Sequence, residues 1–295
     1  DGGSVDLSGL SSSSGATNIN GLSDALVEDN SIYLGNDPSS TSSTAQYNVG
    51  VGIDVMDAVT TGDNNTAIGF NSLKTNSTGE KNVAVGGASL TLNTTGSYNT
   101  AVGYDALSSN TTGYENTALG IQSLKSITTG TQNVGVGFGA LYSNTANYNT
   151  AVGPYALYDN AGGSNNTAVG TWSLKDNTSA SNNVAIGKSS LYKNTTGSNN
   201  VAVGASALEK NTTASANTAV GYEAVYSNTT SSGNTGVGYQ ALKTNTGDNN
   251  TAVGAEALEL NTSGGTNTAV GGKVLYANTT GTDNSALGYG SLQAN

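Results

Sequence analysis

The chain of 295 residues contains no cysteine and no histidine, and all nine of its basic residues are lysine. Without cysteine, no disulfide framework stabilises the fold. Without histidine, the commonest general base and transition-metal ligand is missing, and Ser-His or Cys-His nucleophilic sites are excluded. The formal net charge of −11 and the lack of arginine argue against nucleic-acid binding, because that function requires a cationic surface.

Large apolar side chains are also scarce. The sequence has two Phe, one Trp, one Met and two Pro, against 41 Gly. Such a composition is typical of a disordered chain or of a repeat fold, because the material for an ordinary globular core is lacking. No apolar run approaches the length of a membrane span, so we expect no membrane insertion in this segment.

What the sequence has instead is a regular seventeen-residue repeat. Each copy contains a tetrad such as T-A-V-G, whose glycine, here called position 0, recurs fifteen times from Gly52 to Gly288. A degenerate earlier copy ends at Gly35. A disordered chain would not keep apolar residues in phase over fifteen copies, so the sequence favours a repeat fold. The step is shorter by a single residue at two places, Gly137 to Gly153 and Gly238 to Gly254.

The other positions of the repeat keep the same phase. Position −4 is always Asn, −3 is Thr or Val apart from Ser285, −2 is Ala or Gly, and −1 is Val, Ile or Leu. Position +4 is Leu apart from Met56 and Val225, and +7 is Asn apart from Val59 and Ile127. The representative positions to which we assign structural roles are Asn65, Gly69, Leu73, Asn99, Gly103, Leu107, Asn166, Gly170, Leu174, Asn217, Gly221, Asn267 and Gly271.

Each of these positions has a physical interpretation. The run of β-branched, small and β-branched residues predicts a strand, and the glycine that follows predicts a corner. The Asn residues suit turns, and their amides are expected to form hydrogen-bonded ladders when coils stack. The N-T-T-G-like stretch after +7 is where we expect the single-residue deletions to be absorbed.

These features predict an all-β protein. Its fold would be a parallel β-solenoid, or β-roll, of about fifteen 17-residue coils over residues 30–295, with a degenerate first coil over 30–47. Residues 1–29 are expected to form a linker and an attachment or capping segment. Within them, residues 21–29 are expected to make one short helical turn capped by Ser23.

The small residue at −2 bears on assembly. We expect the −3 and −1 side chains to point into the coil, so that Ala or Gly at −2 points outward. An outward column that is always small and uncharged indicates close packing of another backbone, so we predict a homo-oligomer with its chains intertwined or side by side. The alternative is a monomeric solenoid with a plain Ala stripe.

Tyr is the enriched side chain, with 15 copies, mostly at positions +1 and +5. Exposed aromatic rings among Asn and Thr residues stack on sugar rings and hydrogen-bond to hydroxyl groups, whereas the alternative role is packing between coils or chains. The candidates for contact with a receptor or glycan are Tyr104, Tyr142, Tyr158, Trp172, Tyr192, Tyr222, Tyr226, Tyr239, Tyr276 and Tyr289.

Carboxylates fall at variable positions, and we expect them to be solvated rather than catalytic. Glycoside hydrolysis needs two of them, but no copy of the repeat stands apart as an active site would. The calcium-binding motifs of EF-hands and nonapeptide rolls are absent. We therefore expect no enzyme activity, no cofactor and no metal. The acidic residues considered are Asp105, Glu223 and Glu256 at +2, Glu209 and Glu259 at +5, and the scattered Asp63, Asp159, Asp176 and Asp248.

The repeat resembles a known pattern. The segment Asn65–Gly69 with Ser72 and Leu73 is similar to the N-S-V-A-I-G-x-x-S-x-A repeat of YadA-like head domains of trimeric autotransporter adhesins. The resemblance covers about residues 48–295 and implies a trimeric left-handed parallel β-roll. It departs in period, because that family's coils are shorter, and Leu here replaces the final small residue.

A second resemblance concerns virion proteins. Repeats such as Asn99–Leu107 followed by Asn110–Gly113, and the entry segment 26–37, look like those of tail-fibre and other structural proteins of marine bacteriophages. This implies an extracellular, trimeric fibre whose partners are copies of itself, other fibre or baseplate proteins, and a bacterial surface glycan or protein.

Other functions stay open beside the phage fibre. They are an autotransporter-type bacterial surface adhesin or other extracellular filament, a polysaccharide depolymerase, and an ice-binding solenoid. Ice binding requires a flat exposed array of Thr, whereas Thr at −3 is expected to point inward.

Overall fold

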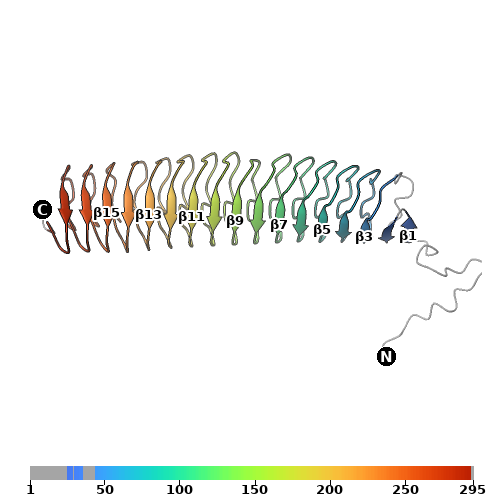
Figure 1. Cartoon of the computed structure of the whole chain (residues 1–295), viewed down its shortest axis with the longest axis horizontal. Coiled ribbons are helices and arrows are strands. Elements are labelled where there is room, and N and C mark those ends of the chain that lie inside the picture. Colours follow the sequence, from blue (N-terminus) through green and yellow to red (C-terminus); the bar gives the residue numbers. More distant parts are fainter. Residues whose placement is uncertain (1–24, 29, 36–43, 294–295) are drawn as a thin grey trace, which may run out of the picture. The chain divides into compact units, whose positions relative to one another are not determined.

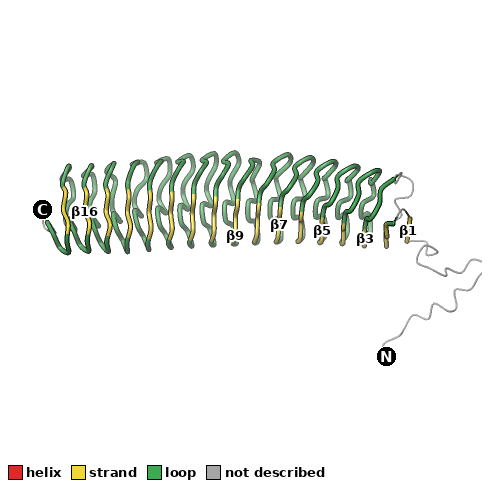
Figure 2. Tube along the Cα trace, viewed as in Figure 1, coloured by secondary structure: helices red, strands yellow, loops and turns green. Residues whose placement is uncertain are grey.

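The computed structural model describes residues 25–28, 30–35 and 44–293. The chain forms two compact units, residues 1–129 and 130–295. Both units are built from very short strands joined by longer loops and turns (Figures 1 and 2). No helix occurs in the described ranges. The prediction of an all-β parallel solenoid is confirmed.

In the first unit, a strand recurs once per coil and pairs in register with the strand one coil away. For example, Ala67 lies beside Ala84, and Ala84 lies beside Ala101. The strands from β2 to β7 run parallel (Figure 1). They are β2 (Ser31–Leu34), β3 (Val49–Val51), β4 (Thr66–Ile68), β5 (Val83–Val85), β6 (Thr100–Val102) and β7 (Thr117–Leu119).

The second unit repeats this arrangement over ten strands, all parallel and in register. They are β8 (Val134–Val136), β9 (Thr150–Val152), β10 (Thr167–Val169), β11 (Val184–Ile186), β12 (Val201–Val203), β13 (Thr218–Val220), β14 (Thr235–Val237), β15 (Thr251–Val253), β16 (Thr268–Val270) and β17 (Ser285–Leu287).

The first unit also contains one antiparallel strand. Residues Ala25–Glu28 form β1, which pairs with β2 so that Val27 lies beside Ile32. The predicted helical turn over 21–29 is therefore wrong where it can be checked, and Ser23 lies outside the described residues. The chain reverses between Glu28 and Ser31, and Asn30 takes a left-handed conformation with φ of 60°. Pairing with β2 satisfies backbone groups that one isolated helical turn would leave open.

The predicted direction of the strand side chains is also wrong. Ala at −2 points into the coil and is fully buried, as at Ala101 and Ala168. The Thr, Val or Ile residues at −3 and −1 lie on the outside and are partly exposed. Inward and outward side chains alternate along each strand as expected, but the side chain at −2 is the inward one and those at −3 and −1 are the outward ones.

The physical reason for the small −2 residue is the narrow interior of the coil. The small residue at −2 faces buried side chains at +3 and +4. A Cβ added at Gly236 would lie 2.6 Å from Cγ2 of Val225, and one added at Gly50 would lie 3.1 Å from Cγ1 of Val55. The space is therefore filled by the chain itself, and the Ala column is not evidence for a second chain.

The repeat glycine combines two requirements. Gly103 has φ of 135°, and a Cβ there would approach the carbonyl carbon and oxygen of Gly120 to 2.6 Å. The predicted corner role of Gly69, Gly103, Gly170, Gly221 and Gly271 is confirmed, since all five have φ between 125° and 135°. Close stacking of each glycine on the next coil adds a steric reason to the conformational one.

Three further positions of each coil adopt left-handed conformations, mostly without glycine. They are −5, +2 and +4, and at +4 the residue is Leu with φ near 50°, as at Leu107 and Leu174. Left-handed residues other than Gly, Asn and Asp are uncommon and cost about 1–2 kcal/mol each. From Leu73 to Leu275 the +4 Leu side chains are fully buried, so core packing offsets this cost.

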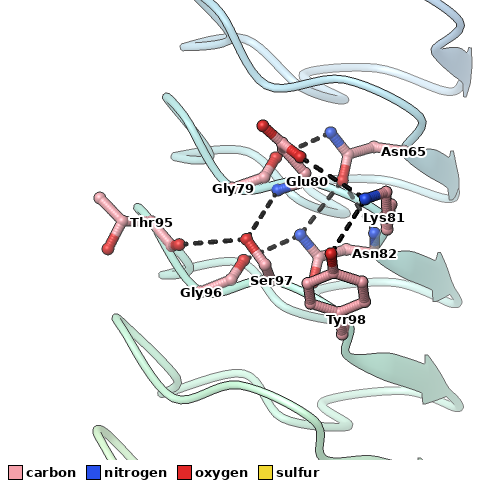
Figure 3. Close-up of polar contacts among 9 residues, drawn as sticks. All are labelled: Asn65, Gly79, Glu80, Lys81, Asn82, Thr95, Gly96, Ser97 and Tyr98. Carbon is pink, nitrogen blue, oxygen red and sulfur yellow. Dashed lines mark hydrogen bonds and ion pairs between the residues drawn. The ribbon is translucent and has the colours of Figure 1, made fainter.

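The predicted Asn ladders are present, and the −4 ladder is drawn in Figure 3. The backbone N–H of Asn82 donates to Oδ1 of Asn65 at 2.9 Å, and its Nδ2 donates to the same oxygen at 3.1 Å. The Nδ2 of Asn65 donates to the carbonyl of Gly79, and that of Asn82 to the carbonyl of Gly96. Every polar atom of these buried amides has a partner, so the ladder ties each coil to the next.

A second ladder at +7 joins side chain to side chain. The Nδ2 of Asn93 donates to Oδ1 of Asn76 at 2.8 Å, and that of Asn110 donates to Oδ1 of Asn93 at 2.7 Å. The position one coil further is Ile127, and Oδ1 of Asn110 is buried without a hydrogen-bond partner. The second unit has the same ladder, for example from Asn177 to Asn160.

The two shortened coils lose their residue between +7 and −4, as predicted. There the two ladders touch: Asn149 donates to Asn144 and Asn250 donates to Asn245, each at 3.1 Å. The strands stay in register across both deletions. The loop between the ladders therefore absorbs the change.

Candidate binding surfaces

The outer sheet face consists of the −3 and −1 side chains of the strands, and it is uncharged in every copy. At −1 every residue is Val, Ile or Leu, and at −3 every residue is Thr, Val or Ser. These side chains are open to solvent: Ile68 is 41% exposed and Ile186 is 40% exposed. Each unit thus carries a regular column of branched aliphatic side chains on its surface. Sequence reasoning missed this face because it assigned these residues to the interior.

The Tyr candidates at +1 are the more exposed group. Tyr104, Tyr222, Tyr239 and Tyr289 are all about half exposed or more. The rings of Tyr222 and Tyr239 stack across one coil step, with centroids 5.8 Å apart. Their exposure leaves these amphipathic side chains accessible, which suits contact with a polar ligand.

The candidates at +5 are half-buried, and several lie against a neighbour. Tyr142 stacks on Tyr158 with centroids 4.8 Å apart. The Nζ of Lys210 lies 4.7 Å from the ring of Tyr226, and that of Lys273 lies 5.9 Å from the ring of Tyr276. The first two contacts join neighbouring coils, whereas Lys273 and Tyr276 belong to one coil, and partial exposure keeps ligand contact a prediction.

The structure adds two aromatic residues that sequence reasoning left out. Phe138 at +1 and Tyr155 at +2 lie edge to face with centroids 5.2 Å apart, and Tyr155 also contacts Tyr158 at 5.6 Å. The signal in the sequence was weak, because Phe138 at +1 is separated along the chain from Tyr155 at +2 of the next coil, and the two meet only when one coil lies on the next. Trp172, the remaining candidate, is 39% exposed, and Lys188 lies over its ring at 5.8 Å.

Three of the carboxylates at +2 are bound to lysines. Asp105 pairs with Lys125 at 3.0 Å, and Glu256 pairs with Lys273 at 3.2 Å. Glu223 accepts hydrogen bonds from Lys243 and the Gln240 amide, both at 2.8 Å. The hydrogen bond from Lys243 lowers the pKa of Glu223, against an opposing effect of burial.

The two carboxylates at +5 are Glu209 and Glu259. Partial burial raises the pKa of Glu259, and the nearby Glu256 carboxylate raises it further. Two carboxylates therefore do lie near each other, and one of them, Glu256, is paired with Lys273.

The scattered aspartates have structural partners. Asp63 accepts the backbone N–H of Gln46, and Asp248 accepts that of Ser232, both at 2.7 Å. Asp159 and Asp176 both bind Lys175. Within the described ranges there is no group of three or more residues suited to hold a metal ion.

Several +7 Asn residues lie in Asn-x-Thr triplets, which are acceptor sequences for N-glycosylation. Asn93 and Asn211 are fully buried, and their Nδ2 atoms donate to a backbone carbonyl and to the Asn of the preceding coil. The ladder therefore makes these amides inaccessible in the folded chain.

In the part of the chain that the structure describes, no helix has the length and apolar character needed to cross a bilayer. Comparison with protein-family models, with curated proteins and with solved structures gave no match.

Proposed function

We propose that this chain is a structural shaft or adhesive segment of an extracellular fibre, of the bacteriophage tail-fibre kind, which assembles from three copies and contacts a bacterial surface receptor. The observation that carries the proposal is the outer sheet face, with its in-register columns of exposed Val, Ile and Thr residues. Parallel sheets are normally covered on both faces. Here the coil covers the inner face, and the outer face is open.

Other copies of the same chain are the partner that best fits this face. The face is uncharged and repeats once per coil, so an identical face matches it in period and chemistry. A continuous column of exposed apolar side chains is typical of an interaction site. A homotrimer arranged around a shared axis buries all three faces at once.

Binding to a host would then rest on avidity. Three chains with repeated surfaces multiply weak individual contacts without any chemical turnover. Other fibre or baseplate proteins would be the further partners. The same assembly would serve an autotransporter-type bacterial surface adhesin, which stays the alternative.

The assembly is tested by measuring molecular mass in solution with light scattering and sedimentation. We expect three times the chain mass for the wild type and the monomer mass for the double variant Ile186→Lys, Val203→Lys, which puts charge on the outer sheet face. The matched control is Thr196→Lys, an exposed turn residue, which should stay trimeric. A monomeric wild type would overturn the assembly.

Ice binding is a second candidate, which one observation favours. Nine of the fifteen −3 residues are Thr, and they point outward rather than inward. Thr at −3 was expected to point inward, which argued against ice binding, and this argument does not hold because these Thr residues lie on the outside. Thermal hysteresis of the purified chain would support this function, and unchanged ice growth would exclude it.

A further inference from the structure

One stretch of the second unit is richer in aromatic residues than the rest of the repeat. Residues 138–192 contain the only Trp of the chain, one of its two Phe and five of its Tyr residues. In a solenoid, most positions keep each coil on the next, so a local departure is where a specific function is expected. Stacking of coils brings side chains at +1, +2 and +5 together into one cluster.

The aromatic cluster consists of Phe138, Tyr142, Tyr155, Tyr158 and Trp172. Its first four rings form a continuous series of contacts, with centroids 4.8–5.6 Å apart. Trp172 stands at the same coil position as Tyr155, one coil further along. Phe138 and Trp172 are the most exposed members, at 43% and 39% exposure, and the three Tyr side chains are half-buried.

Lys175 lies beside the cluster and is paired with two aspartates. Its Nζ lies 2.9 Å from Asp176 and 3.3 Å from Asp159. The same Nζ lies 5.7 Å from the ring centroid of Tyr158 and 5.6 Å from that of Tyr192. Burial raises the pKa of the Tyr158 phenol, and Tyr142 and Asp159 raise it further, so the hydroxyl stays protonated at neutral pH. The charge of Lys175 is thus paired with two aspartates, while Lys188 lies over the ring of Trp172.

The backbone beneath the cluster is held from coil to coil. The backbone N–H of Ser143 donates to the carbonyl of Tyr158 at 2.9 Å, and that of Asp159 donates to the carbonyl of Lys175 at 3.0 Å. Leu157, the residue before Tyr158, is fully buried. Aromatic side chains on such a rigid support lose little conformational entropy when they bind a ligand.

From this arrangement we infer that the aromatic cluster is a binding site for an uncharged polysaccharide. Tyr and Trp rings with polar tips match the apolar C–H faces and hydroxyl groups of sugars. An anionic polymer is disfavoured, because Lys175 is paired with two aspartates and the chain carries a net charge of −11. This inference rests on the proposed function and assigns the receptor class.

Trp172 provides a direct readout, since it is the only Trp of the chain. The full chain would be titrated with dextran, mannan and galactan, and separately with dextran sulfate, while the Trp emission is recorded. We expect a saturable change with at least one of the three uncharged polymers. No change with any of them would overturn the site, and tighter binding of dextran sulfate than of dextran would overturn the uncharged class.

Variants that retain Trp172 locate the site. Tyr158→Ala should weaken binding about tenfold, the value of one lost aromatic contact. Tyr158→Leu keeps apolar packing and should weaken binding similarly, which separates loss of the ring from loss of folding. The matched control is Tyr98→Ala, which removes an exposed Tyr outside the cluster and outside the candidate contacts, and should bind as the wild type does. Equal loss in the control would overturn the assignment.

The mass of each sample separates this inference from the proposed function. A trimer that binds no uncharged polymer would overturn the binding site alone. A monomer that binds through Trp172 would overturn the assembly alone.

Discussion

At the scale of single residues, two requirements repeat in every coil. The buried Asn amides must find partners, and the repeat glycine must combine a left-handed backbone with close approach of the next coil. Both follow from stacking identical coils, because any polar group or extra atom is repeated at each level. Single substitutions at these positions should therefore be costly.

Asn93→Ala removes the donor to Oδ1 of Asn76 and to the Gly96 carbonyl, and it also removes the acceptor for Asn110. We expect the free energy of unfolding to fall by about 2–3 kcal/mol, because buried polar groups lose their partners. Urea denaturation measures the change. Thr95→Ala, at a neighbouring exposed position, should stay within about 0.5 kcal/mol of the wild type. Equal effects would contradict a role for the ladder.

Gly170→Ala tests the corner. The added Cβ would lie 2.8 Å from the carbonyl of Gly187, and φ of 125° is unfavourable for Ala. We expect a loss of about 2–4 kcal/mol in thermal or urea unfolding. Gly162→Ala is the control, since a Cβ there meets nothing within 4 Å and should leave the midpoint nearly unchanged.

At the scale of the strand, the narrow interior determines which residues are tolerated. Inside, the −2 residue is Ala or Gly in all fifteen regular copies. Outside, Thr and Val replace each other at −3 between copies. The +4 Leu column completes the core, with its backbone in a left-handed turn. The inner face of each strand therefore tolerates few residue types, whereas the outer face tolerates several.

Ala168→Val and Thr167→Val are adjacent changes on opposite faces of β10. Overpacking should make Ala168→Val destabilising by about 1–3 kcal/mol, whereas Thr167→Val should be nearly neutral, because Val occupies that outer position in other copies. Thermal unfolding of both variants checks the direction of the side chains. The reverse order would mean that the strand faces are exchanged.

At the scale of the whole molecule, charge is sparse and acidic, and lysines link carboxylates of neighbouring coils. Such pairs are partly exposed, so each contributes little by itself. Solubility follows from the net negative charge, while cohesion follows from the ladders and the core.

The Glu223–Lys243 pair predicts a pH dependence. The pKa of Glu223 lies below its ordinary value of 4.5 in the folded chain, so its stabilising effect is present above 4.5 and is lost as pH falls through the lowered value. Glu223→Gln should therefore reduce stability slightly at pH 7, by less than about 1 kcal/mol. The difference should vanish at strongly acidic pH. In a Lys243→Met background, Glu223→Gln should lose most of this effect, as a pH series of urea unfolding curves will show.

Much of the fold was determined by the sequence alone. The 17-residue period predicted the parallel solenoid, the glycine corners, the Asn ladders and the loop that absorbs the deletions, because each needs only a residue type at a fixed phase. Tertiary structure alone decided which strand face lies inside, because alternation determines that faces differ but not which one is buried. It also decided that Leu takes a left-handed turn and that Phe138, Tyr155 and Tyr158 meet, since these depend on the width of the coil and on how one coil lies on the next.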